Sequence, residues 1–168
     1  MSELVRRAGR GTDATGALVV WSVAEGRGGR RWREVRSVTG SGVASSLLLE
    51  TDPDGRFSHA ELGTEAGLLT LHPEGDGTIH GNVVTAAGVE HVRGLPWSTD
   101  AVLLVEDSTI AAAAAAHALG HVVAAGTSVM RPAVIVNLGL AVRSGDVSIT
   151  AVDGDGLPRL ADSQTWSI

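Results

Sequence analysis

The sequence predicts an α+β fold in which a curved, antiparallel half-barrel sheet of about nine or ten strands carries one long alanine-rich helix. Short apolar and β-branched runs recur along the chain, with Gly, Pro and Asp turn clusters at intervals of about eight to twelve residues. This pattern is typical of antiparallel strands. It is interrupted once, by the consecutive alanines of residues 111–116, which favour a helix.

The N-terminal residues 1–16 are rich in Arg, Gly and Thr and show no hydrophobic periodicity, which predicts a loose arm. We expect the remainder, residues 17–168, to form a single β-rich domain. Its first strands are expected at 17–23, 32–38 and 43–51. The turn at 52–55, Asp-Pro-Asp-Gly, ends the third strand, because proline presets one dihedral and Asp-Gly tolerates a positive φ.

Residues 56–95 are expected to form four strands joined by three tight turns. In two antiparallel strands joined by a turn, the residue numbers of two opposed residues add up to twice the number at the centre of the turn. With the three turns of this segment, the rule places four histidines in a row on one face: His59, His72, His80 and His91. His91 lies opposite His80 or on its diagonal, depending on the turn. The reverse face is then apolar, which supports the register independently; it carries Ala60, Leu62, Leu69, Leu71, Ile79, Val83 and Val92.

A short strand at 101–106 precedes the helix, which we expect over about 109–124. Asp107 or Ser108 is a suitable N-cap and Gly126 a suitable stop. The small side chains should let the helix lie close to the apolar face of the sheet. Further strands are expected at 133–142, 146–152, 157–161 and 164–168.

Composition excludes several classes of function. The 168-residue chain has no cysteine, so a disulfide framework or a Cys-based metal site is excluded. Residues 1–36 hold eight arginines and four acids, a charge of +4, whereas the remainder holds five arginines and fifteen acids, a charge of −10. An acidic body argues against nucleic-acid binding. A secretory signal or membrane span is not expected, since the chain lacks a long apolar run, and the expected location is cytoplasmic.

The middle of the chain resembles a family of bacterial proteins named for glycolipid binding, whose biochemistry is undetermined. The likeness rests on the segments Leu49-Glu50-Thr51-Asp52-Pro53-Asp54-Gly55-Arg56-Phe57, Leu68-Leu69-Thr70-Leu71, Glu74-Gly75-Asp76-Gly77 and Gln164-Thr165-Trp166. It implies an open, curved antiparallel sheet that embraces a helix, similar in shape to bacterial lipoprotein carriers. The family's Thr-Pro-Phe-Thr-Asn-Thr segment is missing, and residues 109–125 occupy its place, so no functional residue is carried over.

The leading hypothesis is a non-enzymatic binding module that holds a lipid-like or other amphipathic ligand in an apolar groove between helix and sheet, without a cofactor. Ala113 and Ala114 are the expected groove residues, because alanine leaves volume that a leucine-rich helix would fill. Trp21 or Trp97 is expected near the mouth.

Two alternatives stay open. In the first, a metal-dependent enzyme uses the row of His59, His72, His80 and His91, since neighbouring imidazoles with a carboxylate such as Glu61 can bind zinc, copper or nickel. In the second, the chain is a structural or oligomerising domain whose groove is filled by its own helix or by a second copy in a homodimer. His117 and His121 share a helix face, a spacing that also binds zinc, but they lack the adjacent glutamate of metalloproteases. The sequence therefore favours surface or groove-lining roles for that pair.

Overall fold

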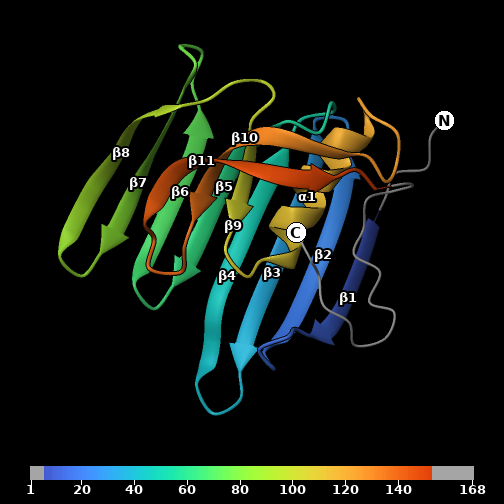
Figure 1. Cartoon of the computed structure of the whole chain (residues 1–168). Helices are drawn as coiled ribbons and strands as arrows, with labels where there is room; N and C mark the ends of the chain where they lie inside the picture. The colour runs from blue at the N-terminus through green and yellow to red at the C-terminus, as the bar shows by residue number, and fades with distance from the viewer. Residues whose placement is uncertain (1–5, 153–168) are drawn as a thin grey trace.

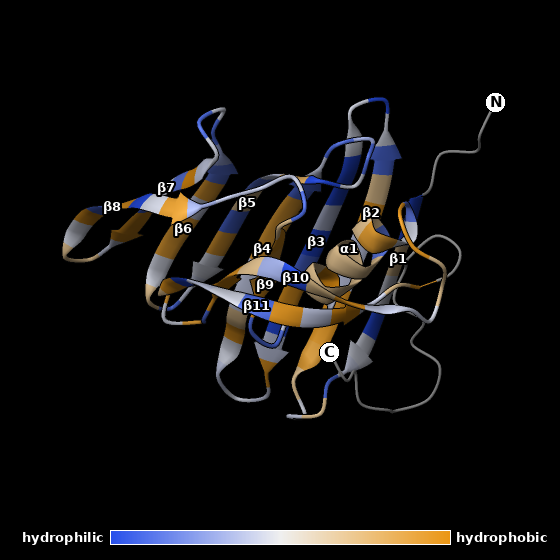
Figure 2. Ribbon diagram, turned by 45° about the horizontal axis from the view of Figure 1, so that its top comes forward, coloured by the Kyte–Doolittle hydropathy of each residue, from blue (hydrophilic) through white to orange (hydrophobic). Residues whose placement is uncertain are grey.

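The computed structural model describes residues 6–152, in which eight strands form one curved antiparallel sheet in chain order (Figure 1). Each strand pairs with the next through a short turn. The bounds are β1 (Arg6–Thr12), β2 (Leu18–Gly26), β3 (Gly29–Val38), β4 (Gly42–Thr51), β5 (Phe57–Thr64), β6 (Gly67–Pro73), β7 (Thr78–Thr85) and β8 (Gly88–Pro96). Hydrophobic and hydrophilic residues alternate along these strands (Figure 2), as expected when one face of a sheet is buried.

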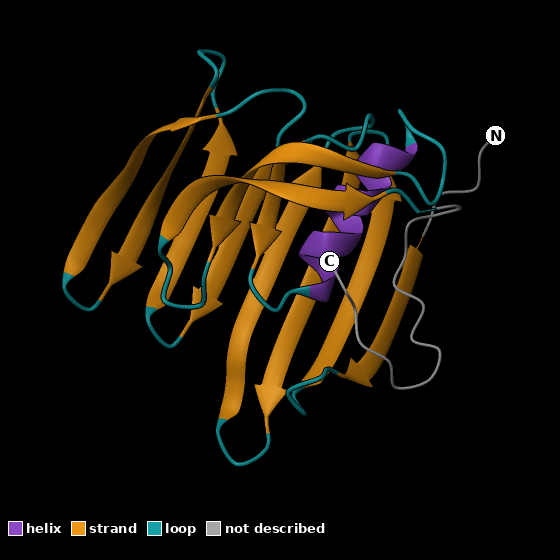
Figure 3. Cartoon of the chain, viewed as in Figure 1, coloured by secondary structure: helices purple, strands orange, loops and turns teal. Residues whose placement is uncertain are grey.

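A second, three-stranded sheet crosses in front of the first (Figures 1 and 3). It contains β9 (Val102–Val105), β10 (Ser128–Val136) and β11 (Val142–Thr150), in the order β11-β10-β9. β9 and β10 are parallel and are connected by helix α1 (Thr109–Gly120). Parallel neighbours need such a crossover connection, so β9, α1 and β10 form a β-α-β unit.

The structure confirms a mainly antiparallel α+β fold, but it corrects the expected single sheet of nine or ten strands. The strands divide into sheets of eight and three, and one pairing is parallel. The physical reason is β9, whose four residues are all buried, whereas an amphipathic strand would expose alternate positions. A strand buried on both faces belongs between two layers.

Helix α1 lies on the apolar face of the large sheet and contributes to two cores. Ile110, Ala111, Ala113 and Ala114 pack in the cluster that contains Trp32, Leu49, Ala60, Leu71 and Ile79. Ala115, Ala116 and Leu119 pack with Val102, Leu104, Ala133, Ile135 and Ile149. The Ser108 hydroxyl accepts a hydrogen bond from the Ala111 N–H and caps the helix as expected. In residues 6–152, no helix has the length and apolarity needed to cross a membrane.

The prediction that residues 1–16 form a loose arm is wrong for residues 6–12. Arg6–Thr12 forms β1, paired with β2 from Arg6 opposite Ala24 to Thr12 opposite Leu18. The strand lacks an apolar pattern because it is an exposed edge strand. Gly9 makes the pairing compact, since a Cβ there would lie 2.6 Å from the Trp21 ring. Edge strands rich in charge lack the signal by which strands are recognised.

The turn between β10 and β11 also differs from expectation. Residues 143–145 were the expected turn, but the chain reverses between Val136 and Val142. There the Asn137 side chain accepts a hydrogen bond from the Ala141 N–H at 3.0 Å, and Leu140 adopts a φ of 67°. An asparagine turn therefore ends β10. The expected strands at 157–161 and 164–168 lie outside the described residues.

Candidate functional site

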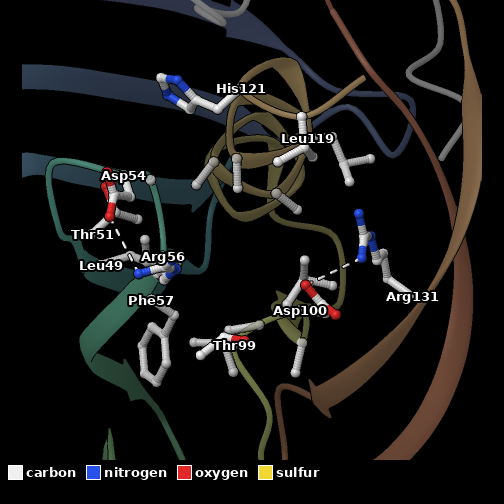
Figure 4. A pocket seen from close by; sticks show the side chains of 18 residues that line it. Leu49, Thr51, Asp54, Arg56, Phe57, Thr99, Asp100, Leu119, His121 and Arg131 are labelled. Atoms are coloured by element: carbon white, nitrogen blue, oxygen red, sulfur yellow. Dashed lines mark hydrogen bonds and ion pairs between the residues drawn. The ribbon is translucent and has the colours of Figure 1, made fainter. Parts of the chain in front are cut away.

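A pocket of about 280 Å³ lies where α1, the 52–56 turn and the small sheet meet (Figure 4). One wall consists of small and aliphatic side chains of the helix and of the residues just after it: Ala114, Ala115, Ala118, Leu119 and, past the helix end, Val122. The other walls contribute apolar residues from β4, β5 and β9: Leu49, Phe57, Val102 and Leu103. The pocket therefore combines an aliphatic wall with polar side chains on its other sides, among them Thr51, Thr99 and Asp100.

Gly55 allows the 52–56 turn to lie directly on the helix. It has a φ of 81°, and a Cβ there would lie 3.1 Å from Ala118 Cα and 3.3 Å from His121 Cδ2. The turn is held by Asp52, whose side chain accepts hydrogen bonds from the Asp54 and Arg56 N–H groups. Any larger residue at position 55 would push the turn outward and open this wall of the pocket.

Two arginines reach the pocket from opposite walls (Figure 4). Arg131 of β10 pairs with Asp100 at 3.4 Å; its side chain is 18% exposed, whereas that of Asp100 is 71% exposed. Among the described residues, the buried Nε of Arg131 has no hydrogen-bond acceptor. Arg56 pairs with Asp54 at 3.2 Å, and both of those side chains are more than half exposed. A guanidinium has five N–H donors, so Arg131 retains donor capacity beyond its exposed partner.

The structure separates the residues expected to bind the ligand. Ala114 lines the pocket. Ala113 lies one residue away but packs in the core. Trp97 packs edge-on against the lining residue Phe57, with ring centroids 5.3 Å apart, but does not itself line the pocket. Trp21 is buried beneath β1 in the same core cluster and does not line the pocket. The sequence missed both arginines, because the contacts that bring them together are long-range.

The histidine row has the predicted register. His72 lies opposite His80, and the pairing of Ala60 with Leu71 places His59 one step beyond, opposite His72. His91 lies opposite Asn82 and hence on the diagonal to His80. All four histidines lie on the face opposite the core, and the apolar residues predicted for the reverse face, such as Leu71 and Ile79, are buried.

The side chains of the row turn toward separate partners. His59 contacts Glu61 at 3.1 Å, His72 contacts Glu74 at 2.9 Å and His80 contacts Thr78 at 2.9 Å. His91 contacts Asn82 at 2.5 Å. Within residues 6–152, no group of three or more His, Asp or Glu side chains is placed to hold a metal ion. Metal binding by the row stays a prediction that these contacts do not favour.

A second histidine pair lies at the end of α1. His117 and His121 approach each other with their Nε2 atoms 3.3 Å apart and their ring centroids 4.7 Å apart. The ring of His117 also packs on fully buried Trp32, at a centroid distance of 5.8 Å. His121 is exposed and belongs to the lining of the pocket.

Buried charges hold the start of α1 on the large sheet. Glu34 of β3 is 2% exposed and accepts a hydrogen bond from the Ile110 N–H at 3.0 Å. Burial raises the pKa of Glu34, although bonds from Ile110 and Ser108 and the charge of Arg36 oppose the rise. A carboxyl oxygen of Glu34 thus accepts from an N–H in the first turn of the helix, which has no acceptor within the helix.

Arg36, also buried, forms ion pairs with Asp13 and, at 3.8 Å, with Asp107. Burial opposes the charge of Asp13, but hydrogen bonds from Thr15, Arg36 and Ala17 outweigh it and lower its pKa to about 2. This network fastens the end of β1 to the helix start. Glu34 and Arg36 share a strand face with Trp32. Each face of β3 carries mostly polar residues with an apolar residue among them, Trp32 on one and Val35 on the other, so alternation alone could not show which face is buried.

No family model and no curated protein matches this chain. Among solved structures, it is similar to the crystal structure of a DUF1089 family protein from Pseudomonas aeruginosa, with a TM-score of 0.52 and 19% sequence identity. The match covers 80% of this chain and 72% of that one. At this identity the likeness concerns the fold alone. It agrees with the curved β-sheet architecture expected from the sequence and gives no support for glycolipid binding.

Proposed function

We propose that this protein is a non-enzymatic binding module for a small amphipathic ligand with an acidic head group. The ligand's apolar part lies against the alanine wall of α1, and its anionic head pairs with Arg131. The pocket volume of about 280 Å³ suits a short acyl chain rather than a long-chain lipid.

One observation carries the proposal: a mostly buried arginine with an unused donor lines a pocket in which the apolar wall of α1 lies opposite polar residues such as Thr99 and Asp100. Asp100, the partner of Arg131, is 71% exposed at its side chain and lies at 3.4 Å, longer than a strong charge-assisted bond. A buried N–H donor without an acceptor costs free energy. A carboxylate or phosphate ligand would provide acceptors in the planar geometry that guanidinium groups prefer.

Calorimetric titration with three probes of equal chain length tests this: octanoate, 1-octanol and octylammonium. We expect octanoate to bind most tightly and octylammonium most weakly. Arg131→Gln should weaken octanoate binding by about tenfold or more, because a hydrogen bond to a charged group contributes about 1.5–3 kcal/mol. It should leave octanol binding nearly unchanged. Arg143→Gln, which removes an exposed arginine of β11, is the matched control.

Equal binding of octanoate and octylammonium would refute the acidic head group. Native mass spectrometry of the purified protein addresses the remaining alternatives. A co-purifying small acid supports the proposal. A dimer mass without any ligand, combined with no binding of the three probes, would instead establish the oligomerising domain.

A further inference from the structure

We propose that His117 and His121 form a binding site for one divalent transition-metal ion of the zinc, copper or nickel class. The site lies at the last turn of α1, beside the pocket. It is distinct from the histidine row on the opposite face of the large sheet, and it does not depend on the ligand proposed above.

The distance between the two imidazole nitrogens carries the proposal. The Nε2 atoms of His117 and His121 lie 3.3 Å apart. Two nitrogen ligands at about 2.0–2.1 Å from a tetrahedral zinc ion are about 3.3–3.4 Å apart. The same distance also suits an N–H···N hydrogen bond, so the two nitrogens are placed to share either a proton or a metal ion.

Packing holds the first imidazole in place before any metal arrives. The ring of His117 lies 5.8 Å from that of Trp32, which has no exposed surface. Positions four apart on a helix lie on one face, so the backbone of α1 sets the spacing of the pair. A preorganised pair loses less side-chain entropy on binding than two free imidazoles would.

The described residues supply two ligands to the site. Among residues 6–152, no third His, Asp or Glu is placed beside the two imidazoles. His121 is exposed and borders the pocket, which gives a metal ion access. The net charge of −6 favours approach of a cation. Imidazole nitrogens suit zinc, copper and nickel rather than magnesium or calcium.

Titration of untagged, chelator-treated protein with Zn²⁺, followed by calorimetry, measures the site directly. We expect the parent to bind one equivalent of zinc and His121→Asn to lose it. The zinc affinity should fall by more than about tenfold, because even the loss of a partner outside the coordination shell lowers metal affinity by about that factor. Because His121 is exposed, this variant should fold like the parent. His117→Asn should have the same effect on zinc, and circular dichroism shows whether it folds.

The matched control is His72→Asn with His80→Asn, which removes another adjacent pair, on the outer face of the sheet. This control should retain the equivalent that His121→Asn loses. With Cu²⁺, electron paramagnetic resonance of the parent should show coupling to two imidazole nitrogens, and that of His121→Asn to one at most. Zinc binding that is unchanged in His121→Asn, or that disappears in the control, would overturn the proposal.

Discussion

Replacing Ala114 by leucine distinguishes a pocket that is open from a helix that is closely packed. Ala114 is 4% exposed and lines the pocket of about 280 Å³. An isobutyl group that enters this space gains about 0.8 kcal/mol for each buried methylene. It loses about 0.5–1 kcal/mol of side-chain entropy. For three added carbons the free energy of unfolding should therefore rise by up to about 2 kcal/mol, and by less if part of the side chain stays in solvent.

Ala111 provides the matched control on the same helix. It has no exposed surface, packs in the main core and does not line the pocket. Leucine at position 111 must displace its neighbours, which costs about 1–3 kcal/mol through overpacking. The free energies of unfolding of the two variants should therefore differ by about 1–5 kcal/mol although the chemical change is identical.

Urea denaturation followed by circular dichroism measures both variants, and calorimetry measures octanoate binding. Ala114→Leu should lower octanoate affinity by about tenfold or more, because its side chain occupies the volume that the ligand needs. If Ala114→Leu costs as much stability as Ala111→Leu, the pocket does not accept a side chain and the binding hypothesis loses its basis. Unchanged octanoate affinity in a stable Ala114→Leu protein would place the ligand elsewhere.

Three further predictions concern the buried charges and the edge strand. Glu34→Gln should become more stable relative to the parent as pH rises above about 4.5. Because the pKa of Glu34 is raised in the folded protein, the stability that the protonated carboxyl contributes to the parent is present at low pH and is lost as the carboxyl ionises. Urea denaturation between pH 4 and 8 measures the free energy of unfolding of both proteins. A parent whose stability rises relative to the variant as pH rises contradicts the prediction. Asp13→Asn should lower the free energy of unfolding by about 2 kcal/mol at pH 7, because the pKa of Asp13 is lowered from 3.8 to about 2 in the folded protein. This loss should vanish as pH falls through that range, and a loss that is independent of pH contradicts the prediction. Gly9→Ala should lower the free energy of unfolding by about 1–3 kcal/mol, measured by thermal or urea unfolding, because the added Cβ meets the Trp21 ring. The control Gly28→Ala, whose Cβ meets nothing within 4 Å, should change it little. Equal effects of the two variants would mean that β1 does not pack against Trp21.

The sequence by itself determined the strands whose apolar residues alternate, the turns between them and the existence of the helix. The rules are local: side chains alternate with period two, and a turn centre fixes which residues oppose each other. The pairing of His72 with His80 follows from such rules, and the structure has it. The rules left His91 opposite His80 or on its diagonal, and Asp107 or Ser108 as the cap; the structure has the diagonal position and the Ser108 cap. Where the local signal was absent, as in β1, or shifted, as at Asn137, the sequence prediction failed.

Only the tertiary structure decided how the elements divide into layers and which side chains meet. The parallel pairing of β9 with β10 depends on contacts between segments about thirty residues apart, and no local pattern specifies it. The same holds for the pocket, because Arg131 reaches it from β10 of the small sheet and Arg56 from the turn between β4 and β5 of the large sheet. The spacing of His117 and His121 follows from the helix, but the packing of His117 on Trp32 follows from the docking of that helix on β3. Such side chains meet because burial of apolar surface draws distant segments together, and burial depends on the whole fold.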